Sequence, residues 1–129
     1  MNEKAKMKKT VAVLGASADR SKYSNKAVRA YLSQGWDVYP VNPKGGEIED
    51  LKSYASLGDI PVKIDRVTMY LPPALGVQVL PAIAKANPVE FFVNPGAESE
   101  DLVHAAQRLG LDPILACSIV EIGESPDDF

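Results

Sequence analysis

Five short apolar segments alternate along the chain with stretches of helical periodicity. They cover residues 10–15, 36–41, 66–71, 89–93 and 113–117. The first segment is apolar on both faces, which is typical of a strand inside a parallel sheet. Strands that alternate with helices indicate an α/β domain, because each helix returns the chain to the start of the next parallel strand. We therefore predict an α/β fold with a mainly parallel sheet.

Helices are expected between these strands. The first covers residues 24–34, and the last begins at Ser99, which can cap it, and ends before Gly110. The middle helix carries Pro81, which predicts a kink or an early turn. Residues 44–60 carry weaker signals, a short edge strand at 51–54 and one helical turn at 56–60.

Length and composition limit the classes of function. The chain has 129 residues and is predicted to be a single domain, with a basic tail at residues 1–8 and an acidic tail at 122–129. A net charge of −3 gives no general attraction to nucleic acid or to an anionic membrane. One cysteine, Cys117, excludes an intramolecular disulfide framework, and one histidine, His104, excludes a multi-histidine metal site. We expect a cytoplasmic protein without a metal.

The loops that follow the strands are the candidate binding region, since ligands of open parallel sheets bind outside the carboxyl ends of the strands. These loops read Gly15-Ala16-Ser17, Asn42-Pro43-Lys44, Leu71-Pro72-Pro73, Asn94-Pro95-Gly96 and Cys117-Ser118. They hold neutral hydrogen-bonding groups, and only Lys44 is a candidate general base. No Ser–His–Asp or Cys–His pairing is found in them. The loops therefore favour binding over catalysis.

The first loop can bind phosphate. Gly15 lets the backbone approach a ligand closely, and Ser17, Arg20 and Ser21 offer hydroxyls and a positive charge. The helix that begins near Ser24 would direct its N–H groups to the same place. The alternative is a plain strand–helix connection that needs glycine for its geometry.

The second loop discriminates between nucleotides. An NAD site usually places an acid after the second strand, to bind the ribose hydroxyls. This chain instead has Lys44 there, which would attract a phosphate on the ribose. Coenzyme A and NADP both carry such a phosphate. The alternative is that Lys44 is a solvated lysine of a turn.

The remaining loops allow two interpretations each. Residues 70–73 either form an apolar shelf beside the first loop or only end a strand with prolines. Residues 94–97 either present N–H groups to a ligand or form a tight turn before a helix. Cys117 is expected to be a buried structural thiol, with a redox-active thiol as the alternative.

The order and spacing of six segments resemble the CoA-binding protein family. The segments are VAVLGAS, YPVNPKGG, SLGDIP, IDRVTMYLPP, VNPGAES and ACSIV, within roughly residues 8–123. The family is similar to the N-terminal domain of the succinyl-CoA synthetase α subunit. The resemblance implies a Rossmann-like, doubly wound, mainly parallel sheet of five to six strands with helices on both faces.

The resemblance also implies roles for residues at the carboxyl edge of the sheet. The loop from Gly15 to Ser21 would meet the phosphates, and Lys44 would lie near the ADP part. Two further turns would line the nucleotide and face the pantetheine arm. The full set of predicted binding residues is Gly15, Ala16, Ser17, Arg20, Ser21, Asn42, Pro43, Lys44, Tyr70, Leu71, Pro72, Asn94, Pro95 and Gly96.

Ligase activity is not carried over, because the chain has no counterpart of the synthetase domain with the phosphorylated histidine. The expected function is to bind coenzyme A or an acyl-CoA without catalysis, as a carrier, a sensor or a regulatory module. The alternatives are an NADP-binding reductase and a CoA transferase or ligase component that acts with a partner. The sequence leaves open a homo-oligomer or a partner protein.

Overall fold

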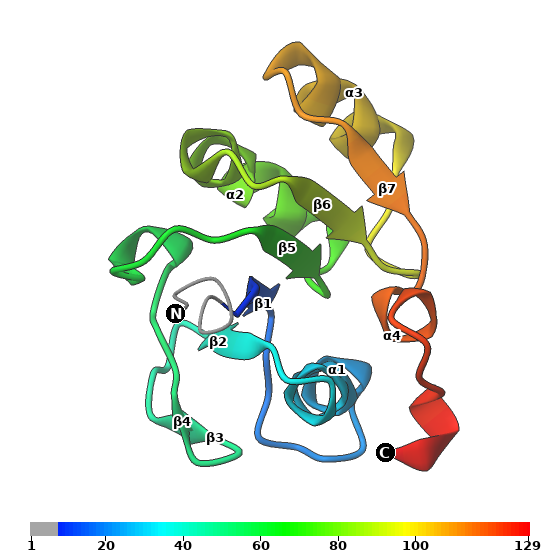
Figure 1. The fold of residues 1–129 in the computed structure, drawn as a ribbon. Helices are drawn as coiled ribbons and strands as arrows, with labels where there is room; N and C mark the ends of the chain where they lie inside the picture. Colours follow the sequence, from blue (N-terminus) through cyan, green and yellow to red (C-terminus); the bar gives the residue numbers. More distant parts are fainter. Residues whose placement is uncertain (1–7) are drawn as a thin grey trace, which may run out of the picture.

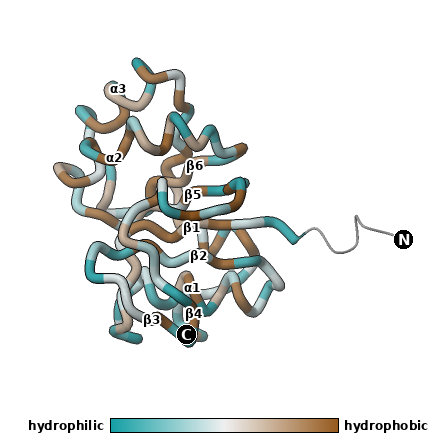
Figure 2. The backbone as a smooth tube through the Cα atoms, turned by 90° about the vertical axis from the view of Figure 1, so that its left-hand side faces the viewer, coloured by the Kyte–Doolittle hydropathy of each residue, from teal (hydrophilic) through white to brown (hydrophobic). Residues whose placement is uncertain are grey.

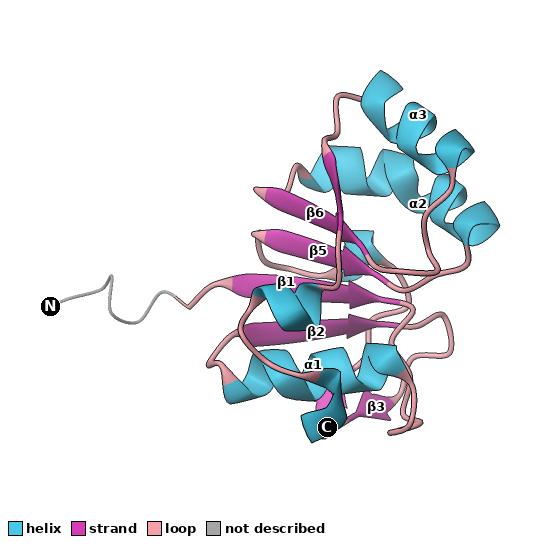
Figure 3. Ribbon diagram, turned by 90° about the vertical axis from the view of Figure 1, so that its right-hand side faces the viewer, coloured by secondary structure: helices cyan, strands magenta, loops and turns pink. Residues whose placement is uncertain are grey.

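A parallel sheet forms the centre of the molecule (Figure 1). In the computed structural model, which describes residues 8–129, five strands lie in the order β2-β1-β5-β6-β7. They are β1 (Thr10–Leu14), β2 (Asp37–Val41), β5 (Arg66–Met69), β6 (Glu90–Val93) and β7 (Pro113–Leu115). All neighbouring pairs are parallel, and in Figure 3 the arrowheads of β2, β1, β5 and β6 point to one side. The predicted basic tail falls outside the described residues except for Lys8, which is exposed.

Helices cover both faces of the sheet, which confirms the predicted Rossmann-like α/β fold. Helix α1 (Tyr23–Ser33) and the short helix α4 (Ser118–Glu121) pack on one face, and α2 (Pro73–Ala86) and α3 (Glu100–Arg108) pack on the other (Figure 1). Strand β1 shows how the sequence builds two cores: Val11 and Val13 face α1, whereas Ala12 and Leu14 face α2. Figure 2 shows hydrophobic stretches along the strands and alternating hydropathy along α2 and α3.

The ends of α1 and α3 follow the sequence signals, whereas the early turn considered for Pro81 is not found. The Ser99 hydroxyl accepts a hydrogen bond from the amide of Leu102 at 3.1 Å, so the predicted cap of α3 is confirmed. Helix α1 is followed by Gly35 with a φ of 84°. Pro81 does not stand in an early turn: it lies inside α2, on the exposed side, and the helix continues to Ala86.

The weakly predicted region between β2 and β5 contains a small hairpin. Its strands are β3 (Glu47–Ile48) and β4 (Leu51–Lys52), and only Tyr54 makes a parallel bridge to the end of β2. The edge strand expected at 51–54 is therefore shorter and is half of a hairpin. The helical turn expected at 56–60 is confirmed as η2 (Leu57–Asp59).

The C-terminal segment is more structured than its acidic composition indicates. After α4 the chain forms a turn of 3-10 helix, η3 (Pro126–Asp128), and Phe129 packs against the core under α1. Ile119 is fully buried. The side chain of Arg66, at the start of β5, holds this segment through Glu121 at 2.6 Å. Residues 122–129 thus lie against the domain.

None of the helices in the described part of the chain combines the length and apolar character that crossing a bilayer requires.

Candidate functional site

The switch in strand order places a crevice between the carboxyl ends of β1 and β5. The chain leaves β1 to form β2 on one side, and it later returns to form β5 on the other side of β1. The connections therefore diverge at the β1–β5 boundary, which is where open α/β sheets bind their ligands. An added Cβ at Gly15 would lie 3.1 Å from the Leu71 side chain and 3.2 Å from the Tyr70 carbonyl carbon. Only glycine fits this close approach.

Two hollows adjoin at this point. The larger, of about 600 Å³, is lined by the loop after β1 (residues 15–22), the starts of α1 and α2 and the turn after β6: Gly15, Ser21, Lys22, Tyr23, Ser24, Tyr70, Leu71, Pro72, Pro73, Pro95, Gly96 and Ala97. The smaller, of about 270 Å³, has mostly apolar walls: Leu14, Gly15, Val41, Pro43, Ala55, Ser56, Leu57, Leu71, Leu75, Gln78, Val79 and Ala82. Gly15 and Leu71 line both hollows, which therefore adjoin at these two residues.

The starts of two helices face the larger hollow without side-chain caps. Neither Lys22, before α1, nor Pro72, before α2, provides a capping hydrogen bond. No acceptor for the backbone N–H groups of Tyr23, Ser24 and Asn25 is found within residues 8–129. Free N–H groups at a helix start attract anions. Helix α3, by contrast, is closed by its own serine.

The main chain of the loop after β1 is held from three sides. The Asn42 side-chain amide donates to the carbonyl of Ala16 at 2.7 Å, and that of Asn25 donates to the carbonyl of Ser17 at 2.8 Å. Arg29 donates to the carbonyl of Arg20 at 2.8 Å. These bonds fix the main chain of the loop.

Within the loop, Asp19 forms hydrogen bonds with both serines, Ser17 and Ser21. The Asp19 amide donates to the Ser17 hydroxyl, and the Asp19 carboxylate accepts from the Ser21 hydroxyl at 2.7 Å and from the Ser21 amide at 3.0 Å. These hydrogen bonds lower the pKa of Asp19, the one from the Ser21 hydroxyl most strongly. The hydroxyl of Ser21 is therefore engaged inside the loop.

The turn after β2 presents Lys44 at the surface. The Asn42 carboxamide oxygen accepts from the amide of Lys44 at 2.8 Å, which shapes the turn while the same side chain holds the first loop. Pro43 lines the smaller hollow. Lys44 itself is exposed and follows Pro43 directly in the chain.

Tyr70 has a hydroxyl with no hydrogen-bond partner in the described structure, although that oxygen is buried. Burial raises the pKa of this phenol, so the group stays protonated at neutral pH. Its ring lines the larger hollow next to Leu71 and Pro72.

Asn94 is buried next to the larger hollow and does not line it. The residue is 1% exposed. Its amide donates to the hydroxyl of Thr68 at 2.7 Å and to the carbonyl of Met69 at 3.0 Å, and its oxygen accepts from the amide of Ser118 at 2.9 Å. The residues that reach the larger hollow are its neighbours Pro95 and Gly96. Asn94 therefore holds this turn in place.

The Asn94→Ala variant is expected to lose about 1–3 kcal/mol of stability, because it leaves the buried Ser118 amide and Thr68 hydroxyl with fewer partners. Urea unfolding measures this loss. A stability equal to that of the wild type would contradict the bonding described above.

The structure thus gathers part of the predicted set into the hollows. Seven of the predicted residues line the larger one: Gly15, Ser21, Tyr70, Leu71, Pro72, Pro95 and Gly96. Pro43 lines the smaller one, whereas Ala16 and Asn42 support the loop from behind. Ser17, Arg20 and Lys44 line neither hollow. Whether these residues contact a ligand stays a prediction.

Sequence reasoning missed one wall of the site. Leu75 and Val79 share a face of α2 and look like core residues in sequence, but both line the smaller hollow and Leu75 is exposed. Their spacing is the signal of a helix face, and it does not tell a core from a cavity wall. Glu49, which contacts the loop from the β3–β4 hairpin, had no signal of its own.

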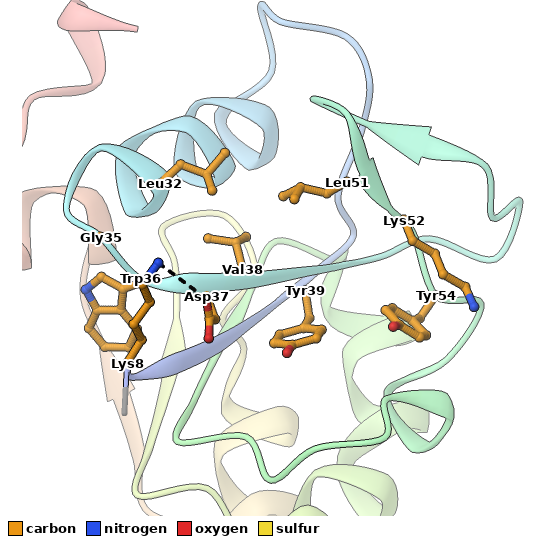
Figure 4. Close-up of a pocket in the computed structure, with 10 residues that line it drawn as sticks. All are labelled: Lys8, Leu32, Gly35, Trp36, Asp37, Val38, Tyr39, Leu51, Lys52 and Tyr54. Atoms are coloured by element: carbon orange, nitrogen blue, oxygen red, sulfur yellow. Dashed lines mark ion pairs between the residues drawn. The ribbon is translucent and has the colours of Figure 1, made fainter. Parts of the chain in front are cut away.

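Another hollow lies at the open edge of the sheet and includes no predicted site residue. Figure 4 shows its residues on both sides of β2, with Leu32, Val38 and Leu51 on one side and Tyr39 on the other. It is a groove along an edge strand.

No group of three or more His, Cys, Asp or Glu side chains able to hold a metal ion is found within residues 8–129. His104 is exposed on α3, and Cys117 is half-buried before α4.

The fold is that of an α/β protein of the Rossmann-like type, with a crevice at the carboxyl ends of β1 and β5. The family model described as a CoA binding domain matches residues 9–123. The chain therefore belongs to the CoA-binding domain family.

Relatives of two kinds support this membership. The α subunit of an ADP-forming acetate–CoA ligase from Pyrococcus furiosus is 38% identical in an alignment of 124 positions that covers 80% of this chain. This chain spans 26% of that subunit's length. Two similar structures are instead of its own size. A conserved hypothetical protein from Pyrococcus furiosus has 34% identity and a TM-score of 0.78, over 89% of this chain and 99% of that one. A Thermus thermophilus protein has 30% identity and a TM-score of 0.78, over 95% and 97%.

Proposed function

We propose that this protein binds coenzyme A or an acyl-CoA in the two hollows at the carboxyl edge of β1 and β5. The observation that carries the proposal is the pairing of an uncapped helix start with an adjoining apolar hollow across Gly15. Coenzyme A joins a diphosphate to an adenosine on one side and to a pantetheine arm on the other, and this arrangement offers a place for each part.

The diphosphate is assigned to the start of α1. Its free amides and the side chain of Lys22 surround the polar end of the larger hollow. The helix dipole and the amide hydrogens together favour negative charge there. The start of α2 adds less, since Pro72 and Pro73 have no N–H group.

The adenine is assigned to the smaller hollow, where Pro43, Leu57 and Val79 provide apolar walls. Lys44 follows Pro43 directly, within the same turn. A phosphate on the ribose would then lie near this lysine. The ribose of NAD carries no such phosphate and would gain no contact with the lysine. The pantetheine arm is assigned to the opposite side, along Pro72, Pro95 and Gly96.

We infer a role without catalysis of its own, as a carrier, a sensor or a regulatory module. The ionisable side chains that line the larger hollow are Lys22, Tyr23 and Tyr70. The raised pKa of Tyr70 makes it a poor general base at neutral pH. A second candidate is a ligase component that acts with a partner chain, favoured by the identity to the acetate–CoA ligase subunit.

Titration calorimetry with coenzyme A, dephospho-coenzyme A, NADP and NAD tests the proposal. We expect binding of coenzyme A, weaker binding of dephospho-coenzyme A and no heat with NAD. Tighter binding of NADP than of coenzyme A would favour the reductase alternative. Absence of binding to all four nucleotides would refute the proposed function.

Lys44→Glu is expected to weaken the binding of coenzyme A by about 1–3 kcal/mol, because a charge-assisted phosphate contact is lost and a like charge replaces it. The dissociation constant would rise by about 5- to 150-fold. Lys63→Glu makes the same charge change at an exposed position before β5, outside both hollows, and should leave binding nearly unchanged. Equal effects of the two variants would remove Lys44 from the site.

A further inference from the structure

One carboxylate contacts the predicted phosphate loop from outside the crevice. The Glu49 Oε2 atom lies 3.4 Å from Nε of Arg20 and accepts a hydrogen bond from the Asn25 side chain at 3.1 Å. The Glu49 side chain is 20% exposed, whereas that of Arg20 is 66% exposed. The acid is therefore held in place, and the guanidinium is free to leave it.

The ion pair is not what fixes the main chain of the loop. The carbonyls of Ala16, Ser17 and Arg20 are each bonded to a different side chain, none of which is Glu49. The pair therefore decides mainly where the head group of Arg20 lies.

That head group lies away from the crevice. Ser21 and Lys22, the next two residues, line the larger hollow, but Arg20 does not. Arginine binds phosphate through two parallel N–H donors, so it is the one long side chain of the loop suited to this task. In the structure its partner is an acid of the same chain, Glu49.

The hairpin turn presents Glu49 to the loop. Glu49 and Asp50 adopt φ angles of 51° and 65°, in the left-handed region that favours Asn and Gly at both positions of a two-residue turn. Two adjacent acids occupy these positions. Only Glu49 contacts the loop, and Asp50 is exposed without an ion pair among residues 8–129.

We propose that Glu49 competes with the ligand for Arg20. In the empty protein its carboxylate holds the guanidinium outside the crevice, and a phosphate of the bound nucleotide takes the guanidinium over. Glu49 thereby lowers the affinity of the site and favours ligands whose phosphate charge exceeds that of a carboxylate. The inference rests on the proposed binding of coenzyme A.

The test is Glu49→Gln, which keeps an oxygen for the Asn25 hydrogen bond and removes the charge that holds Arg20. The dissociation constant for coenzyme A should fall by about two- to fivefold at low ionic strength, the range expected when an exposed ion pair no longer competes. Added salt should reduce this gain. In an Arg20→Gln background the same substitution should give no gain.

Asp50→Asn is the matched control, because it removes one negative charge from the same turn without touching Arg20. We expect no gain in affinity from it. An equal gain from both variants would replace the competition by a general charge effect, and weaker binding by Glu49→Gln would make Glu49 a structural brace. Both results would overturn the inference.

The Nε–H NMR signal of Arg20 gives a second readout. It should shift when wild-type protein binds coenzyme A, and Glu49→Gln should shift it without ligand. A signal that coenzyme A leaves unchanged, in protein that binds it, would overturn the competition and leave the proposed function standing. A wild-type protein that does not bind coenzyme A would refute the proposed function itself.

Discussion

Replacing Arg66 with methionine is expected to lower the free energy of unfolding by about 2–4 kcal/mol. Arg66 is 3% exposed, and its guanidinium lies between the rings of Trp36 at 4.9 Å and Phe92 at 4.6 Å. It also pairs with Glu90 at 2.9 Å and with Glu121 at 2.6 Å. Burial opposes the charge, but the hydrogen bonds that the guanidinium donates to Tyr31, Glu121 and Glu90 outweigh it and raise the pKa of Arg66 above its usual value.

The expected loss is below that of a fully buried pair because Glu90 and Glu121 are 35% and 43% exposed and regain water when the arginine is removed. Urea unfolding measures the change, and thermal unfolding should shift by about 6–15 °C. Glu121→Gln keeps the stacked arginine and should cost about 1 kcal/mol or less. If the two variants were equally unstable, the contact with α4, and not the stacking, would carry the effect.

Gly15→Val is expected to abolish the binding of coenzyme A and to destabilise the protein by about 2–4 kcal/mol. Gly15 has a φ of 81°, which costs a side-chain-bearing residue about 1–2 kcal/mol. The added Cβ would also press on Leu71 and on the Tyr70 carbonyl carbon, at 3.1 and 3.2 Å. The branched side chain would then stand at the neck between the two hollows.

Gly35→Val separates the two causes. Gly35 has a φ of 84°, but an added Cβ meets no atom within 4 Å. The residue precedes β2 and so lies at the amino ends of the strands, opposite the crevice. It should show the backbone cost alone and bind coenzyme A normally. Normal binding by folded Gly15→Val protein would place the ligand away from this neck.

Much of the fold was predictable because its strands carry the pattern of a parallel sheet. Residues 10–15 are apolar on both faces and are closed by a glycine, and the structure shows a buried central strand there. Ser99 was predictable as a cap because a serine that precedes an acidic first turn is a local signal.

The hairpin and the C-terminal segment were not predictable in the same way. A turn built on Glu49 and Asp50 lacks the Asn-Gly signature, and its shape depends on contacts with the distant Asn25. Residues 118–129 are short and acidic, and they are held by residues far away in sequence, through the ion pair of Glu121 with Arg66 and the packing of Ile119 and Phe129 against the core. Local sequence patterns do not indicate contacts between residues that lie far apart in the chain.

The site was predictable in its loops and not in its side-chain roles. The position of Gly15 after a strand indicates a ligand-binding turn wherever strand order reverses. Asn94 stands in an equivalent position, yet its amide is used up within the protein. Whether a residue at such a position faces the crevice or bonds within the protein depends on how β5 packs against β6 and α4.

The three bonded carbonyls of the predicted phosphate loop have a consequence for the proposed binding. A loop that wandered between conformations would lose roughly 1–2 kcal/mol of backbone entropy for each residue that a ligand ordered. Here Asn25, Arg29 and Asn42 hold the main chain before any ligand arrives. A nucleotide would therefore bind a preorganised loop. Its association would resemble rigid-body docking more than binding coupled to folding.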